Sequence, residues 1–126
     1  MRYINSDKAP AALGPYSQAV EANGILYCSG QIPIIPSTGE IIVGDIAKAT
    51  KQVLLNLSEV IKEGGTSIDR VVKATIFIKN MDDFATINGV YEEFFGTHRP
   101  ARAVVEVARL PKDVEIEIEA IVVKGD

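Results

Sequence analysis

The chain has 126 residues, of which 47% are hydrophobic and 24% charged, which fits one folded domain and excludes a disordered chain. Seventeen acidic against thirteen basic residues, with no run of lysine or arginine, disfavour nucleic acid as a partner. The apolar runs are too short to span a bilayer and the N-terminus lacks an apolar signal segment, so we expect a cytoplasmic protein without a membrane partner.

The first half of the chain predicts a hairpin, a loop and a helix. Asn23-Gly24 lies between two apolar-rich runs, which predicts strands at about 16–22 and 25–31 joined by a two-residue turn. Two prolines and two glycines in 32–44 indicate a surface loop. Apolar residues at helical spacing then follow Asp45, the expected N-cap, and the helix should end at Gly64-Gly65.

The second half predicts strand, helix, strand and strand. Residues 71–79 alternate, with Val72 expected in the core and Val71 on the other face, and Asp82-Asp83 caps a helix that carries Phe84 and Phe95. Strands of about 102–110 and 113–124 flank a tight turn at Pro111-Lys112-Asp113. The order ββαβαββ predicts one α+β domain over residues 1–126, a mixed sheet with both helices on one face.

The other face of this sheet would be too apolar for open water and too charged for a dry core. We expect it to carry Phe77, Ile121 and Val123 together with Lys73 and glutamates. Another copy of the chain is the simplest cover for such a face, so we expect an oligomer.

In the stretch RPARAVVEVARLP, residues 99–111, the question is whether Arg102 faces the solvent or an anionic group. Alternation assigns Ala103, Val105 and Val107 to the core, and Arg102, Val104 and Glu106 to the other face. A tight turn at 110–113 would put Ile121 opposite Arg102, and Glu117 roughly 13 Å from it. If both charged groups serve one site, that site is completed between subunits.

The last strand places Glu115, Glu117 and Glu119 on one face. One interpretation is a solvated face with salt bridges to Lys73, Arg102 or Arg109. The other is that one carboxylate is a general base near Arg102.

Other candidate groups lie in the second helix and the second strand. Asn88 shares a helical stripe with Phe84, Tyr91 and Phe95, where an amide is either a satisfied core or interface group or a ligand contact. Cys28-Ser29-Gly30 could present a hydroxyl and an N–H, but no glycine precedes it to form a nucleophile elbow. With a single cysteine and a single histidine, His98, the chain lacks a usual zinc ligand set, so we expect no metal site.

Several segments together resemble the RidA (YjgF) family of reactive-intermediate deaminases. They are APAALGPYSQAV at 9–20, YCSGQIP at 27–33, TGEI at 38–41, DFATINGVYEEFF at 83–95 and PARAVVEVARLPKDVEIEIEAI at 100–121. They span nearly the whole chain in the family's order, and the last segment is highly specific.

The resemblance implies a chorismate-mutase-like fold and a homotrimer, a central barrel with three sites at the subunit interfaces. It implies hydrolysis of short 2-imino or enamino acids, such as 2-iminobutanoate and 2-iminopropanoate, to 2-keto acids and ammonia, without a cofactor. The family's functional positions correspond here to the following residues: Tyr16, Ser29, Gly30, Asn88, Arg102 and Glu117. Many members have a small polar residue and then a cysteine where this chain has Ala103 and Val104, so we expect no role that requires a thiol there and a changed pocket preference.

Within that resemblance, Arg102 would bind the substrate carboxylate bidentately and Glu117 would deprotonate the attacking water. Ser29 and Gly30 would orient the substrate, and Tyr16 would close over it. The competing function is a regulator that binds 2-keto acids without turnover, and some members are linked to translation inhibition or RNA cleavage. The acidic balance disfavours an RNA role here.

Overall fold

The structure is a computed structural model that describes residues 1–125. One mixed sheet carries two helices, α1 (Ile46–Glu63) and α2 (Phe84–Phe95). Its strands are β1 (Arg2–Ile4), β2 (Ala19–Ala22), β3 (Ile25–Gln31), β4 (Val71–Ile78), β5 (Ala101–Glu106) and β6 (Ile116–Val123). The α+β prediction is confirmed, with a sixth strand, β1, that the sequence reading missed because three residues show no usable alternation.

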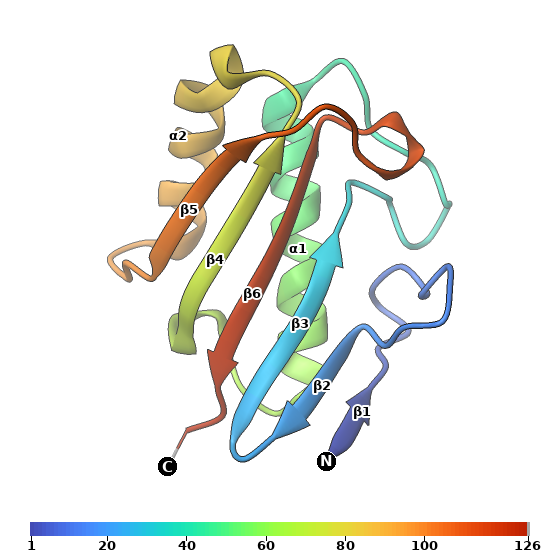
Figure 1. Cartoon of the computed structure of the whole chain (residues 1–126), viewed down its shortest axis with the longest axis vertical. Coiled ribbons are helices and arrows are strands. Elements are labelled where there is room, and N and C mark those ends of the chain that lie inside the picture. The colour runs from blue at the N-terminus through green and yellow to red at the C-terminus, as the bar shows by residue number, and fades with distance from the viewer. Residues whose placement is uncertain (126) are drawn as a thin grey trace.

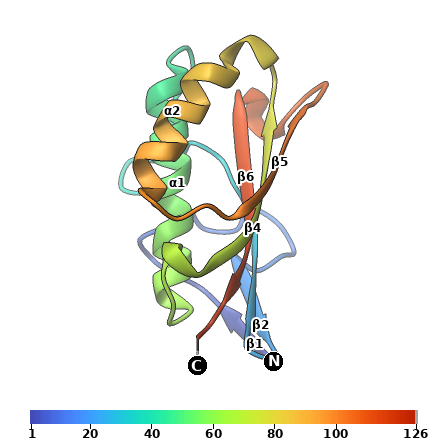
Figure 2. The same ribbon diagram turned by 90° about the vertical axis from the view of Figure 1, so that its left-hand side faces the viewer.

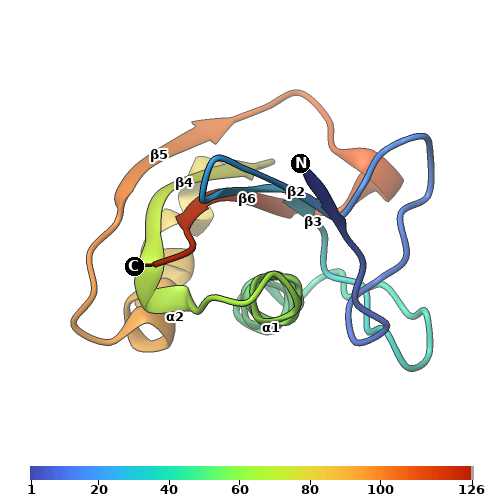
Figure 3. The ribbon, with the colours of Figure 1, turned by 90° about the horizontal axis from the view of Figure 1, so that it is seen from below.

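Both helices lie on the same face of the sheet, as the two side views show (Figure 2, Figure 3). Helix α1 begins where predicted, because the Asp45 side chain accepts a hydrogen bond of 3.1 Å from the backbone N–H of Lys48. Its buried stripe packs on the central strands and forms the core with Leu26, Ile76 and Ile118. Within residues 1–125, neither helix is long and apolar enough to cross a membrane.

The strand order is β1-β2-β3-β6-β4-β5, and only the β4–β5 pair is parallel (Figure 1). Asn23 and Gly24, both at positive φ, make the predicted turn between β2 and β3. The predicted β5–β6 hairpin is wrong, because the chain runs from β4 through α2 into a parallel β5 and then returns to insert β6 between β3 and β4. Ile121 therefore lies opposite Lys73 and Tyr27, and Arg102 opposite Ala74.

The predicted faces of β5 are also reversed. Arg102 pairs with Ala74, which is fully buried under the helices, so Arg102 points to the helix side of the sheet. Val104 follows on the same side, whereas Val105 is exposed on the open face. Alternation alone could not fix the face, since β5 is an edge strand whose small and polar residues fit either side.

An irregularity in the strand register at the start of β4 reverses the predicted burial of two neighbouring valines. Val71 pairs with Val122 and Lys73 with Ile121, so a bulge lies between them. Val71 is buried and Val72 is exposed, the reverse of the sequence prediction.

The open face of the sheet is broadly apolar. The register aligns Val20, Tyr27, Ile121 and Lys73 in one row across four strands. Phe77 and Val123 are only partly buried there, and Tyr27 and Val105 are exposed large side chains. The prediction that Phe77, Ile121 and Val123 share this face is confirmed.

The 32–44 segment is a loop with one isolated bridge, Ile34 to Ile41, and Asn56 of α1 anchors its start. The buried Asn56 amide donates to the carbonyls of Ile32 (3.2 Å) and Ile34 (2.8 Å). Gln52 donates in turn to the Asn56 side-chain oxygen at 2.8 Å. This network fixes the loop against the helix.

Replacing Asn56 by alanine should therefore lower the free energy of unfolding by about 1–3 kcal/mol, because two partly buried carbonyls lose their donor. Chemical denaturation measures this loss. Leu55→Ala, at the neighbouring exposed position, is the control and should change stability by no more than about 0.5 kcal/mol. Equal values for the two variants would contradict the anchoring role.

Candidate functional site

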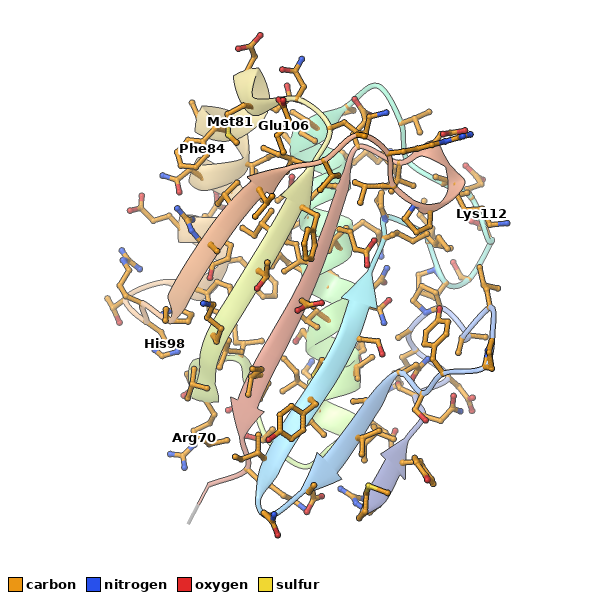
Figure 4. The ribbon with its side chains drawn as sticks, viewed as in Figure 1. Arg70, Met81, Phe84, His98, Glu106 and Lys112 are labelled. Carbon is orange, nitrogen blue, oxygen red and sulfur yellow. The ribbon has the colours of Figure 1, made fainter. Side chains whose placement is uncertain are left out.

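Residues singled out from the sequence fall into two separate pockets. The glutamate pocket has a volume of about 440 Å³ and is lined by Leu13, Tyr16, Ser29, Gly30, Ile32, Pro111, Lys112 and Glu117. The arginine pocket has a volume of about 270 Å³ and is lined by Asn88, Tyr91, Glu92, Arg99, Pro100 and Arg102. Figure 4 shows Lys112 and Phe84, which lies beside Arg102, at opposite sides of the molecule.

Glu117 lies on the central strand β6, and its carboxylate covers the backbone of Gly30. A Cβ atom at position 30 would lie 2.0 Å from Glu117 Oε2 and 2.8 Å from its Cδ. Only glycine leaves room for this approach. An irregularity in the β3–β6 pairing between Cys28 and Gln31 brings Gly30 to this place.

The environment of Glu117 favours the protonated form. Burial is the main cause that raises the pKa of this carboxyl, and the negative charge of Glu119 raises the pKa further. Within residues 1–125 Glu117 forms no ion pair. The alternative of a salt-bridged, solvated face therefore does not describe Glu117, and its carboxylate is a stronger base than an exposed glutamate.

Ser29 and Tyr16 border the glutamate pocket and are held by backbone contacts. Ser29 Oγ donates to the carbonyl of Ser17 at 2.7 Å, which leaves its oxygen lone pairs as acceptors. The Tyr16 hydroxyl accepts from the backbone N–H of Leu13 at 3.3 Å, and half of the side chain is exposed. The loop before β2 thus covers one side of the pocket.

Gln18 shapes this loop, and sequence reasoning missed it. Its buried side chain accepts from the N–H of Ser6 at 2.6 Å and donates to the carbonyls of Ser6 and Pro10 at 3.2 and 2.8 Å. A buried amide with three backbone bonds fixes the path of residues 6–18. In the sequence, this role of Gln18 is indicated only by its position directly before Ala19, the buried first residue of β2.

The opposite wall of the glutamate pocket comes from the turn between β5 and β6. Lys112 and Asp113 both have positive φ, 59° and 56°, and Arg109 pairs with Asp113 at 2.8 Å. The turn presents Pro111 and Lys112 to the pocket. Lys112 was not singled out from the sequence, because an exposed lysine in a turn has no distinguishing pattern.

Arg102 is held by helix α2 at the far edge of the sheet. Its Nη1 donates to Asn88 Oδ1 at 2.8 Å. The guanidinium carbon lies 4.9 Å from the centre of the Tyr91 ring and 5.8 Å from that of Phe84. Among the described residues Arg102 pairs with no carboxylate, so most of its donors remain available to an anion.

Val104 lies on the same side of β5 as Arg102 and packs against the core. It lines neither of the two pockets. Its assignment as a substrate contact stays a prediction.

One chain does not bring Glu117 and Arg102 together. Glu117 pairs with Phe77, and Phe77 with Val105, which is three residues beyond Arg102 on β5. Two strand spacings and three residues along a strand separate the backbones by roughly 14 Å. The two side chains also lie on opposite faces of the sheet, so each pocket holds a part of the predicted site.

The model of the family described as Endoribonuclease L-PSP matches residues 6–124. The chain belongs to this family, which is the RidA (YjgF) family. A RutC family protein of Pyrococcus horikoshii is 53% identical over 121 residues, covering 96% of each protein. The 2-iminobutanoate/2-iminopropanoate deaminase of Escherichia coli K12 is 48% identical over 124 residues, again covering 96% of each.

A solved RidA-family structure has the same fold. The crystal structure of E. coli TdcF with bound serine is 44% identical, has a TM-score of 0.95 and covers 99% of this chain and 100% of its own. This protein is therefore similar over 96% to 98% of its length to family members that are named as deaminases. In residues 1–125, no three His, Cys, Asp or Glu side chains are placed to hold a metal ion.

The raised pKa of Glu117 can be measured by following its side-chain carboxyl ¹³C signal with pH. We expect a pKa above that of an ordinary glutamate. In Glu119→Gln the pKa of Glu117 should fall, because a like charge is removed, yet stay above the ordinary value, because burial is the larger cause. The measurement is repeated in Arg102→Gln, which removes the guanidinium that a neighbouring copy would bring to this pocket, and an ordinary or lowered pKa in that variant would contradict this description of the pocket.

Proposed function

We propose that this RidA-family protein is a hydrolytic deaminase of short 2-imino and enamino acids, releasing 2-keto acids and ammonia. The observation that carries the proposal is the unpaired, half-buried carboxylate of Glu117 over Gly30, with a raised pKa, in a pocket of suitable size. The 48% identity to a protein named 2-iminobutanoate/2-iminopropanoate deaminase suggests those two imino acids as substrates.

In this mechanism Glu117 is the general base. Its carboxylate accepts a proton from a water molecule whose oxygen attacks the imine carbon, giving a carbinolamine. For a protonated imine this carbinolamine is neutral, and its nitrogen takes up the proton that Glu117 received. The Glu117 carboxylate then accepts the proton of the carbinolamine hydroxyl as the C–N bond breaks and the carbonyl forms, and the released ammonia takes that proton away as ammonium. Because an efficient base has a pKa close to the working pH, the raised pKa of Glu117 favours this role, worth about 10²- to 10⁴-fold in rate.

The remaining residues bind and orient the substrate. Arg102 offers planar paired donors to the substrate carboxylate, and Asn88 holds its guanidinium. Ser29 supplies an acceptor and Gly30 a backbone N–H beside the reacting carbon, while Tyr16 covers the pocket. The reaction needs no cofactor, and we infer that it takes place in the cytoplasm.

Both groups can act on one substrate if neighbouring copies of the chain complete the site. Glu117 lies on the central strand and Arg102 on an edge strand of the same chain, and the open face with Tyr27, Phe77 and Val105 is apolar enough to be an interface. We infer a homotrimer in which the glutamate pocket of one copy meets the arginine pocket of the next.

A second candidate function is a sensor that binds 2-keto acids or small amino acids without turnover. The serine in the structure of E. coli TdcF favours a small acid as the ligand of that relative. The family description suggests an endoribonuclease. An RNA-directed role of this kind, or one in translation inhibition, is disfavoured by the net charge of −4.

Glu117→Gln distinguishes the enzyme from the sensor. The amide keeps the shape but cannot accept the proton, so ammonia release from freshly generated 2-iminobutanoate should fall by about 10²- to 10⁴-fold. Binding of 2-oxobutanoate, measured by calorimetry, should persist. Glu119→Gln, two residues away on the same face, is the control and should retain activity, and equal hydrolysis by Glu117→Gln and wild type would reject Glu117 as the base.

Mixed assemblies test whether the site is shared between copies. Arg102→Lys replaces the planar fork by a point charge and should lose about 10- to 150-fold in kcat/KM. When Glu117→Gln and Arg102→Lys chains are unfolded together and refolded, random trimers should contain both native residues in about a quarter of their sites.

The expected result is that the refolded mixture has about a quarter of the wild-type activity and a trimeric mass by light scattering. Each variant refolded alone is the control. Activity that stays at the mean of the two parents would place the site within one chain, and a monomeric mass would remove the interfacial site altogether.

A further inference from the structure

Three residues of α2 face Arg102 from one side of the helix. Phe84, Asn88 and Tyr91 follow each other at i, i+4 and i+7, so they form one stripe. The aromatic members lie 5.8 and 4.9 Å from the guanidinium carbon, and Asn88 accepts its hydrogen bond. Figure 4 shows Phe84 near the start of this stripe, at the exposed end of the helix.

Tyr91 is the rigid member of this stripe. It is 6% exposed, compared with 37% for Phe84, and Asn88 is an exposed side chain. Phe95 packs against the Tyr91 ring with the ring centres 4.6 Å apart. The position of the Tyr91 ring is therefore set by the core, whereas the other two contacts of Arg102 come from exposed side chains.

The ring, and not the hydroxyl, accounts for this contact. Among the described residues the buried Tyr91 hydroxyl has no hydrogen-bond partner. An aromatic face attracts a guanidinium and leaves its in-plane N–H groups free for a carboxylate. Stacking thus orients Arg102 without occupying the donors that the substrate needs.

We propose that Tyr91 is a positioning residue that holds the Arg102 guanidinium in the orientation that binds the substrate carboxylate. This inference rests on the proposed function of Arg102 as the carboxylate clamp. Without the ring, the long arginine side chain must be ordered by the substrate itself, so binding weakens while the bound complex reacts as before.

The test compares Tyr91→Leu, Tyr91→Phe and Phe95→Leu. Tyr91→Leu should raise KM for 2-iminobutanoate and Kd for 2-oxobutanoate by about 5- to 30-fold, the loss expected for a partly desolvated cation–π contact, with kcat within about twofold. Tyr91→Phe keeps the ring and should match wild type. Phe95→Leu, equally buried on the same helix, is the control for disturbed packing: it removes one neighbour of the Tyr91 ring but keeps the ring itself, so it should raise KM and Kd by less than Tyr91→Leu does.

Damage to the fold would give a different pattern. A smaller active fraction lowers apparent kcat and leaves KM unchanged, and Phe95→Leu would show it as strongly as Tyr91→Leu. Equal KM and Kd in these two variants, or a raised KM in Tyr91→Phe, would overturn the inference.

Arg102→Lys separates this inference from the proposed function. In that background Tyr91→Leu should weaken 2-oxobutanoate binding by no more than about twofold, because the two changes remove one shared contact. If Arg102→Lys itself binds 2-oxobutanoate as wild type does, the clamp assignment fails. If Arg102→Lys binds weakly but Tyr91→Leu does not, only the role of Tyr91 fails.

Discussion

The insertion of β6 between β3 and β4 is the constraint on which the rest of the structure depends. It places Glu117 in the middle of the sheet, where Gly30 and the loop held by Gln18 can enclose a carboxylate. It also moves β5 to the edge, where Arg102 contacts Phe84, Asn88 and Tyr91 of α2. A simple β5–β6 hairpin would have produced neither arrangement.

This topology keeps a base and a cation apart in the free chain. Had Arg102 lain beside Glu117, the two would have paired, which lowers the pKa of the carboxyl and uses the donors of the guanidinium. With roughly 14 Å between their backbones, Glu117 keeps a raised pKa and Arg102 keeps its free N–H groups. In the proposed shared site the two groups meet only across the interface between copies, where a bound substrate carboxylate takes the donors of Arg102.

The sequence predicted the elements well and their arrangement less well. Local signals such as the Asp45 cap and the Asn23-Gly24 turn have short-range causes, and both were confirmed. Strand order and the face of an edge strand depend on long-range packing, so Arg102 was assigned to the wrong face. The residue pattern marked Arg102, Glu117 and Asn88 as candidates, and the family resemblance gave their roles. The roles of Gln18 and Tyr91 depend on hydrogen bonds and ring contacts that exist only in the folded chain.

Because β5 turns the opposite face to the helices from the one predicted, the presence of Val104 in place of a cysteine has a different consequence. On the open face, a valine in place of the cysteine of other members would have bordered the interface and the pocket. On the helix side it packs against the core beside Arg102, where an apolar group of similar size is readily accommodated. Val104 lines neither pocket of the single chain. Its assignment as a substrate contact stays a prediction, and we expect the exchange to act through packing of the strand that carries Arg102.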